Sequence, residues 1–382
     1  MDQPLHERLI QWRRHLHAHP ELSLREHETA RFVAACLDEL GIPHVDGVGG
    51  NGIVATIARG ASNRSVGLRA DMDALPITET TGAPYASRNP GVMHACGHDG
   101  HAASLLGAAA LLVRDESWSG TVQLVFQPAE EGYGGARSML ADGLLERFPM
   151  ERIFGYHNWP GLAAGTVAIH DGACMAGGAR VYITLRGLAG HAAMPHLTRD
   201  PMVAAGHLIV ALQSVVSRNI DPLETAVISI GMVEGGVAAN QICDTVTLRG
   251  THRTFKPAVR DAVDAGIRRV AAGIAATFAM DAEVEITPGI GPVVNDLACA
   301  ELVARAATAS GLALRRDLPP SMASEDFGWY MAERPCAFMW IGNGPAEGGR
   351  GLHNPNYDFN DDILPAAAEA LASTARQALR AA

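Results

Sequence analysis

Residues 93–126 read MHACGHDGHAASLLGAAALLVRDESWSGTVQLVF, a polar loop followed by an apolar helix and then an apolar strand. The spacing of the apolar residues predicts a helix over 101–113 and a buried strand over 121–126. Other apolar runs alternate with helical segments on both sides of this unit. The alternation predicts an α/β fold, with a largely parallel mixed sheet between layers of helices.

The remaining elements of this larger domain follow the same pattern. A helical region is expected at 6–40, interrupted at Pro20, because proline ends or kinks a helix. A further helix is expected at 135–148. Buried strands are expected at 52–57, 65–70, 152–156 and 337–341.

The pattern changes between residues 179 and 289. Here the expected order is strand, helix, strand, strand, helix, strand, at 179–186, 200–218, 225–234, 245–254, 256–280 and 282–287. This β-α-β-β-α-β order is the split βαβ arrangement of a ferredoxin-like α+β sandwich. The sequence therefore predicts a domain at 179–289, inserted into a larger domain formed by 1–178 and 290–382.

Composition excludes several classes of protein. The formal net charge of −11 and the pI near 5.8 argue against a nucleic-acid or anionic-membrane partner. No stretch approaches the roughly 18–20 apolar residues of a membrane span, and the N-terminus lacks a signal-peptide core. The six cysteines form no CxxC pair, which suits reduced thiols. We therefore expect a cytoplasmic enzyme.

Residues of the types that bind metal ions follow the expected strands or precede an expected helix. The sheet of an α/β protein binds its ligands at the carboxyl ends of its strands, so these loops should meet in one crevice. A thiolate, imidazoles and a carboxylate are the ligands of a transition-metal site, and one further carboxylate could act as a general base. The residues concerned are Cys96, His98, Glu130, Glu131, His157 and His353.

Six segments, in order along the chain, carry a resemblance to a known family. The chain resembles the zinc-dependent aminoacylase and carboxypeptidase metallopeptidase family over nearly its whole length. It is most similar to the amidohydrolase branch, which contains hippurate hydrolases, N-acyl-L-amino-acid hydrolases and indole-acetyl-amino-acid hydrolases. The segments are RRHLHAHPELS (13–23), RADMDALP (69–76), MHACGHD (93–99), QPAEEG (127–132), GHAAMPH (190–196) and SEDF (324–327).

The resemblance implies two divalent metal ions per subunit, with Mn, Zn, Co and Ni as candidates. It implies that Cys96 bridges the two ions where other branches have an aspartate. His98, Glu131, His157 and His353 would complete the ligand set, Glu130 would be the general base, and Asp73 would orient a ligand. A thiolate ligand by itself favours Zn or Co over Mn.

The resemblance also assigns roles within the inserted domain, which would serve as a lid and as the dimerisation domain of a homodimer or homotetramer. His191 would reach the active site of the partner subunit and donate to the oxyanion of the tetrahedral intermediate. Asn240 and Arg253 would bind the substrate carboxylate, for which a guanidinium is well suited. Cys243 stands where the family commonly has proline.

Three functions remain open from the sequence. The Cys-Gly-His step favours metal-dependent hydrolysis of N-acyl-amino acids, which is a small-molecule substrate class. A dipeptidase or carboxypeptidase with the same two-metal chemistry is the alternative. A non-catalytic relative that only binds ligands is disfavoured, because Glu130 and every expected metal ligand are present.

Overall fold

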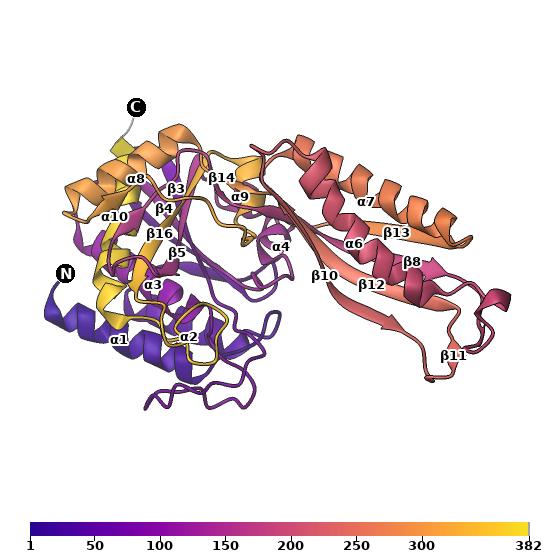
Figure 1. Ribbon diagram of the computed structural model, residues 1–382. Helices are drawn as coiled ribbons and strands as arrows, with labels where there is room; N and C mark the ends of the chain where they lie inside the picture. The colour runs from indigo at the N-terminus through magenta and orange to yellow at the C-terminus, as the bar shows by residue number, and fades with distance from the viewer. Residues whose placement is uncertain (381–382) are drawn as a thin grey trace. The chain divides into compact units, whose positions relative to one another are not determined.

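The computed structural model describes residues 1–380, except for the side chain of Pro288. The chain divides into two compact units, drawn in Figure 1. The first contains residues 1–174, 293–320 and the described chain from 326 onward, and the second contains 175–292 and 321–325.

The first unit is built on an eight-stranded mixed sheet in the order β1-β2-β4-β3-β5-β16-β6-β15. Its centre, from β4 through β3 and β5 to β16, is parallel, and antiparallel pairs flank it. Every residue of β16 is buried, as expected for a strand covered on both faces. The strands are β1 (His44–Val48), β2 (Gly52–Arg59), β3 (Ser65–Asp71), β4 (Gly120–Gln127), β5 (Arg152–Pro160), β6 (Val167–Ala168), β15 (Leu314–Arg315) and β16 (Cys336–Gly344).

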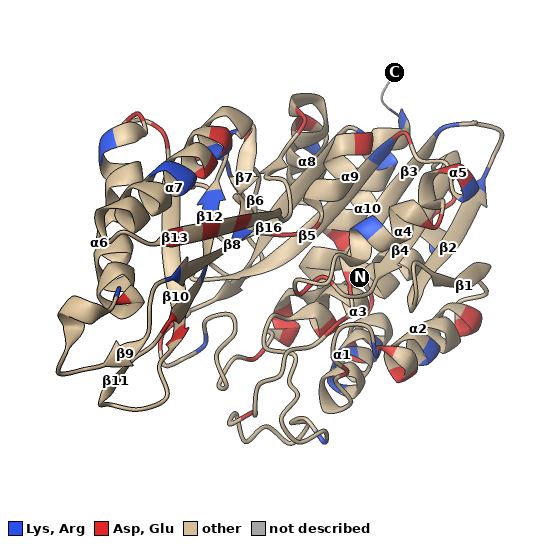
Figure 2. Ribbon diagram, turned by 90° about the vertical axis from the view of Figure 1, so that its right-hand side faces the viewer, with Lys and Arg blue, Asp and Glu red and all other residues tan. Residues whose placement is uncertain are grey.

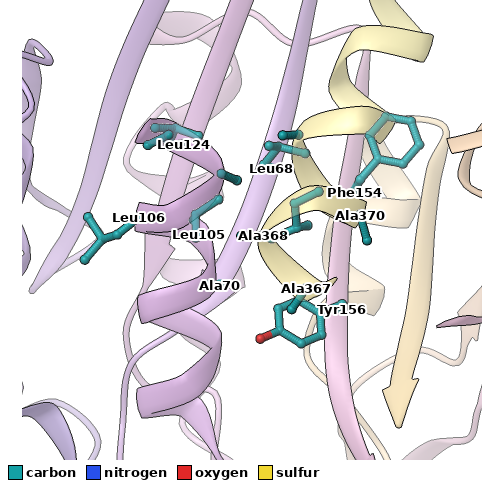
Figure 3. Packing of buried hydrophobic residues seen from close by; sticks show 14 of the residues in the cluster. Leu68, Ala70, Leu105, Leu106, Leu124, Phe154, Tyr156, Ala367, Ala368 and Ala370 are labelled. Carbon is teal, nitrogen blue, oxygen red and sulfur yellow. The ribbon is translucent and has the colours of Figure 1, made fainter. Parts of the chain in front are cut away.

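Helices cover both faces of this sheet. On one face, α3 packs against α1 and α10, and α10 packs against α8. At Gly107 of α3 an added Cβ would lie 2.9 Å from the Cβ of Ala368 in α10, so small residues let these helices approach closely (Figure 3). The helices are α1 (Gln3–Ala18), α2 (His27–Glu39), α3 (His98–Arg114), α4 (Gly135–Ala141), α5 (Leu144–Arg147), α8 (Leu297–Ala309), α9 (Gly328–Glu333) and α10 (Leu364–Arg380), with a 3-10 turn at Asp361–Ile363.

Gly155 of β5 marks the opposite face of the sheet. Its neighbours Phe154 and Tyr156 lie in the cluster with α3 and α10, whereas a Cβ on Gly155 would meet the ring of Phe327 at 2.9 Å. Successive strand residues point to opposite faces, so the segment that leads into α9 covers this second face. The predicted α/β class is confirmed.

Several predicted boundaries in this unit differ from the structure. Helix α3 begins at His98 rather than at residue 101, because Gly97 adopts a left-handed conformation with φ +91° and lets the chain turn directly into the helix. Strand β5 continues to Pro160 and pairs with β16 along its length, so His157 lies inside the strand. The helix expected at 135–148 is two short helices, separated at Gly143 with φ +78°.

The second unit has a four-stranded antiparallel sheet in the order β10-β12-β8-β13. Helices α6 and α7 pack against each other and against this sheet. With its β-α-β-β-α-β chain order, this is the predicted ferredoxin-like arrangement. The elements are β8 (Gly177–Arg186), α6 (Pro201–Asn219), β10 (Ala226–Gly235), β12 (Thr245–Thr254), α7 (Pro257–Thr277) and β13 (Asp281–Pro288).

Sequence signals explain where the two helices of this unit begin. The side chain of Asp200 accepts hydrogen bonds from the backbone of Met202 and Val203, and Pro201 is the first helical residue of α6. Pro257 is likewise the first helical residue of α7, whose N-cap residue Lys256 forms no capping side-chain hydrogen bond. Shorter elements of this unit are β9 (Gly190–His191), paired with β11 (Gln241–Ile242), and a 3-10 turn at Pro195–Leu197. Strand β14 (Val293–Val294), which pairs with β7 (Ala173–Met175), belongs to the first unit.

Among residues 1–380, no helix is both long enough and apolar enough to span a membrane.

Buried charges join the end of α1 to the first turn of α3. His17 Nδ1 lies 2.8 Å from Asp99 Oδ2, and its Nε2 lies 3.2 Å from Glu79 Oε1. The fully buried guanidinium of Arg13 lies 3.6 Å from the same Asp99 oxygen. Asp99 is the second residue of α3, directly after His98, so this cluster fixes the position from which His98 projects.

The pKa of His17 reflects opposing effects. Burial lowers the pKa, but the hydrogen bond and charge of Asp99 and the hydrogen bond to Glu79 outweigh it, and the pKa is raised to about 9. A pKa above the unfolded value of about 6.5 means that protonated His17 stabilises the fold. This contribution is complete below about pH 6.5 and is lost as the pH rises through 9.

We therefore expect H17N to be more destabilising at pH 6 than at pH 9.5, with the difference on the order of a few kcal/mol. Chemical unfolding of wild type and variant at both pH values, with the same metal content, measures it. As a control, H27N changes an exposed histidine at the start of α2 and should alter stability little. An equal loss of stability at both pH values for H17N would contradict the account.

Candidate metal centre

The predicted ligands of the first unit converge, although they come from four separate segments. Their donor atoms form three overlapping groups, in each of which all atoms lie within 4.8 Å of one another. Glu130 and Glu131 follow β4, His157 lies in the last part of β5, His353 lies in the loop after β16, and His98 begins α3 two residues after Cys96, so the residues gather on the side of the sheet expected for an α/β protein. The groups are Cys96 with His98 and His157, Cys96 with Glu131 and His353, and His98 with Glu130 and Glu131.

Cys96 belongs both to the group that contains His157 and to the group that contains His353. Its Sγ lies 3.3 Å from His157 Nε2, and the same thiol belongs to the group with Glu131 and His353. A ligand that joins two ions must occupy such a shared position. Burial and the nearby carboxylates of Glu131 and Glu130 raise the pKa of the thiol well above its usual value. Its deprotonation therefore requires a nearby cation.

Two donor atoms in this cluster lack hydrogen-bond partners. His98 Nε2 and Glu131 Oε1 are buried and accept or donate no hydrogen bond among the described residues, and they lie 3.9 Å apart. Buried polar atoms are nearly always paired, so such atoms indicate a ligand. Imidazole nitrogens, a thiolate and carboxylates are the donors of Zn²⁺, Co²⁺ and related ions. The residues present thus fit divalent metal ions.

Asp73 contacts two of the predicted ligands at once. Its Oδ1 lies 3.2 Å from His98 Nδ1, and its Oδ2 accepts hydrogen bonds from the backbone N–H of Glu131 at 3.0 Å and from Ser23 Oγ at 2.6 Å. Burial lowers the pKa of His98, but Asp71, Asp73 and Glu131 outweigh it and raise the pKa to about 10. Asp73 can therefore hold both ligands in place, since its contact with His98 Nδ1 leaves Nε2 free for a metal.

The turn at Ala129–Gly132 points the side chains of the adjacent residues Glu130 and Glu131 toward different partners. Ala129 and Gly132 both have positive φ, at 54° and 85°. The Ala129 N–H donates to Glu26 Oε1 at 2.8 Å, which fixes this strained residue. Glu130 Oε1 accepts a hydrogen bond of 3.1 Å from the Asp326 backbone, while Glu131 Oε1 lies 3.3 Å from His353 Nε2.

The two remaining histidines are oriented by the backbone. His157 Nδ1 donates to the carbonyl of Asn158 at 2.7 Å, so Nε2 is left as the acceptor that faces Cys96. His353 has φ +61°, and its backbone N–H donates to the carbonyl of Ala95 at 2.7 Å. This bond ties the C-terminal loop to the segment that carries Cys96. The His353 side chain remains 53% exposed, at the solvent side of the cluster.

Asn158 was missed in the sequence analysis, and its hydrogen bonds hold the segment that carries Cys96. Its Nδ2 donates to the carbonyl of Cys96 at 2.7 Å, and its Oδ1 accepts from Tyr357 Oη at 2.7 Å. Its backbone N–H donates to Nε2 of His101, whose Nδ1 lies 2.6 Å from Asp71 Oδ1. The only signal in the sequence was its position directly after His157. His94, by contrast, is buried without a hydrogen-bond partner among residues 1–380, so it orients no ligand in this way.

The three candidates of the second unit lie in two places. His191 and Asn240 are exposed and adjacent, because β9 pairs with β11 and the Ala192 N–H donates to the Asn240 carbonyl at 3.0 Å. Arg253 is half-buried at the other end of β12. The eight residue steps along the strand from Thr245 to Arg253 span roughly 25 Å. One copy of the chain therefore cannot bring Asn240 and Arg253 to a single carboxylate.

Comparison with known proteins identifies the family of this chain. The model of peptidase family M20/M25/M40 matches residues 67–377. N-acetyl-L-cysteine deacetylase of Bacillus subtilis is 42% identical over 376 residues, covering 98% of this chain and 89% of the relative. Hippurate hydrolase of Campylobacter jejuni is 40% identical over 374 residues, covering 96% of each.

The crystal structure of the Bacillus subtilis YxeP protein, described as a dinuclear metal-binding peptidase of the M20 family, superposes with a TM-score of 0.86. It is 37% identical, and the match covers 98% of each chain. The predicted hydrolysis of amide bonds and the predicted resemblance are both confirmed. This chain belongs to peptidase family M20/M25/M40.

Proposed function

We propose that the protein hydrolyses the amide bond of N-acyl-amino acids, with two divalent ions held by the cluster around Cys96. The observation that carries the proposal is the convergence of Cys96, Glu130 and the other donors in three overlapping groups. The names of the two relatives support the substrate class, since N-acetylcysteine and hippurate are both N-acyl-amino acids.

Divalent ions, when bound, would polarise the scissile carbonyl and lower the pKa of a bound water. We propose that Cys96 is shared between the ions and that the remaining ligands are His98, Glu131, His157 and His353. The thiolate favours Zn²⁺ or Co²⁺, with Mn²⁺ and Ni²⁺ as the other candidates. Asp73 would keep His98 in the orientation that a metal requires.

Glu130 would move the proton in this reaction. Its carboxylate lies in one group with His98 and Glu131, and its Oε1 is fixed by the Asp326 backbone. It can take a proton from the attacking water and deliver it to the leaving nitrogen. Its burial, with 8% of its surface exposed, excludes most solvent from that transfer.

Recognition of the substrate would involve both ends of the second unit. Arg253 would bind the carboxylate, and His191 with Asn240 would act in the active site of a partner subunit. The separation of Asn240 from Arg253 within one chain supports this division. A reducing, cytoplasmic location is supported by the six cysteines, all of which are free.

The partner in this proposal is a second copy of the chain. Helix α6 carries one charged residue, Arg218, and it is almost free of charge in Figure 2, whereas α7 is strongly charged. Strand β10 lies at the edge of its sheet, where backbone groups are available for pairing. A twofold axis would place the same apolar surface of two copies together. The exposed apolar residues of α6 on this surface are Met202, Val203 and Val210.

Hydrolysis assays test the proposed reaction. We expect metal-stripped protein to be inactive on hippurate and N-acetyl amino acids, and added Zn²⁺, Co²⁺ or Mn²⁺ to restore activity. E130Q should lower kcat by about 10²- to 10⁴-fold, because the general base is lost. The matched control, E347Q, changes an exposed glutamate and should keep full activity.

Two results would contradict the proposal. Full activity in E130Q would refute the role of Glu130, and cleavage of simple dipeptides without cleavage of any N-acyl-amino acid would favour the peptidase alternative.

Sedimentation analysis tests whether the protein associates with a second copy of itself. We expect the wild type to be a dimer or tetramer and V210E to shift toward the monomer, because a charge would be buried in the apolar surface. V210E should lose activity while its metal content is unchanged, since His191 could no longer reach the partner. V45E, on exposed β1 of the first unit, is the control. A wild type that is monomeric and fully active would refute the dimer proposal.

A further inference from the structure

The Arg253 side chain lies across the neighbouring strand at Gly178, and we propose that Gly178 is a positioning residue that sets the guanidinium for the substrate carboxylate. This inference rests on the role proposed above for Arg253. It concerns residues of the second unit alone, since β8, β12 and the segment at 289–290 all belong to that unit.

The two residues are direct neighbours across the sheet. In the antiparallel pair of β12 and β8, Arg253 is opposite Gly178. A Cβ added to Gly178 would lie 2.9 Å from both Cδ and Cζ of Arg253, and nearer still to Nη1. Real Cβ atoms are not found this close to other heavy atoms, so even a methyl group at residue 178 would displace the guanidinium from its place.

Glycine at this position is explained by that contact and not by backbone conformation. Gly178 does not have the positive φ that favours glycine, so alanine could adopt its conformation. Its N–H donates to the Ile290 carbonyl and its own carbonyl accepts from the Gly289 N–H, both at 3.0 Å, and alanine keeps both bonds. All three of the nearest atoms belong to the flexible side chain of Arg253, which can move without moving the backbone.

In this position the guanidinium of Arg253 can bind an anion. Its Nη1 donates to the His252 carbonyl at 3.0 Å, which fixes one edge of the group. No carboxylate of the described chain forms an ion pair with Arg253, although the residue is half-buried. Burial and the charge of nearby Arg180 both lower the pKa of Arg253, so its charge is poorly compensated within the protein. A carboxylate ligand would supply that compensation.

Recognition of a carboxylate by arginine depends on geometry. The planar fork of N–H donors must face the two oxygens, so a displaced guanidinium loses hydrogen bonds even though its charge is retained. The atoms nearest to a Cβ at residue 178 belong to Arg253, and both backbone hydrogen bonds of Gly178 are to residues of its own unit. A substitution at residue 178 should therefore affect substrate binding through Arg253 and leave the chemical step unchanged.

The experiment compares an N-acyl-amino acid with the same compound carrying an α-carboxamide in place of the carboxylate. Both are assayed with wild type, G178A, R253A and the double variant, and KM and kcat are measured separately. We expect G178A to raise KM for the carboxylate substrate about tenfold or more, the cost of hydrogen bonds to a charged group, with kcat nearly unchanged. KM for the carboxamide should change little.

The double variant separates positioning from a structural role. In the R253A background, G178A should have no further effect on KM, because the side chain that the methyl group would displace is then absent. If G178A alone folds poorly, R253A should restore its melting temperature for the same reason. G273A is the control, since a Cβ on that α7 glycine meets no atom within 4 Å, and its kinetics should equal those of wild type.

Several outcomes would overturn the inference. These are an unchanged KM in G178A, an equal rise in KM for both substrates, an effect that persists in the R253A background, or a fold defect that R253A does not relieve. If R253A itself keeps the preference for the carboxylate, the role of Arg253 in the proposed function fails as well. Loss of that preference in R253A but not in G178A refutes only the inference about Gly178.

Discussion

The burial of several acidic groups around one histidine is the constraint on which the rest of this structure depends. Asp71, Asp73 and Glu131 all lie close enough to His98 to raise its pKa, and the thiol of Cys96 is buried beside two carboxylates. Taking such groups out of water costs free energy unless positive charge compensates them. The protein supplies part of that charge through Arg69, whose Nη1 lies 2.8 Å from Asp71. Divalent cations would supply the remainder.

The fold provides the rigidity that this cluster requires. The cluster of His17, Arg13 and Asp99 holds the first turn of α3, Asp73 joins His98 to Glu131, and Asn158 holds the Cys96 carbonyl. Each of these contacts acts on the backbone or on the far side of a ligand, and leaves the donor atom free. Such outer contacts commonly decide metal affinity as much as the ligands do. In the proposal, the metal ligands and Glu130 belong to the first unit, whereas the second unit carries Arg253 for substrate recognition and His191 for the active site of a partner subunit.

Much of the fold could be predicted because local sequence signals agree with the tertiary structure. Asp200 and Pro201 mark the start of α6, and the predicted strand 245–254 coincides with β12. The prediction failed where a single residue or a distant partner decides a boundary. Gly97 starts α3 three residues early, and pairing with β16 extends β5 beyond Tyr156.

For the candidate site, residue types indicated which side chains could be metal ligands, but not how these side chains are held. The roles of Asn158 and Gly178 depend on neighbours 62 and 75 residues away in the chain, which no local pattern reveals. The contact of the Gly178 position with Arg253, in particular, requires the register of β8 against β12.

The central claim is that Cys96 is shared between two metal ions, and anomalous diffraction from crystals of the metal-loaded protein tests it most directly. The account predicts two anomalous peaks about 3.5–4 Å apart, both within bonding distance of Cys96 Sγ, about 2.3 Å for Zn²⁺. A single peak, or two peaks with the Cys96 sulfur bound to neither, would contradict it.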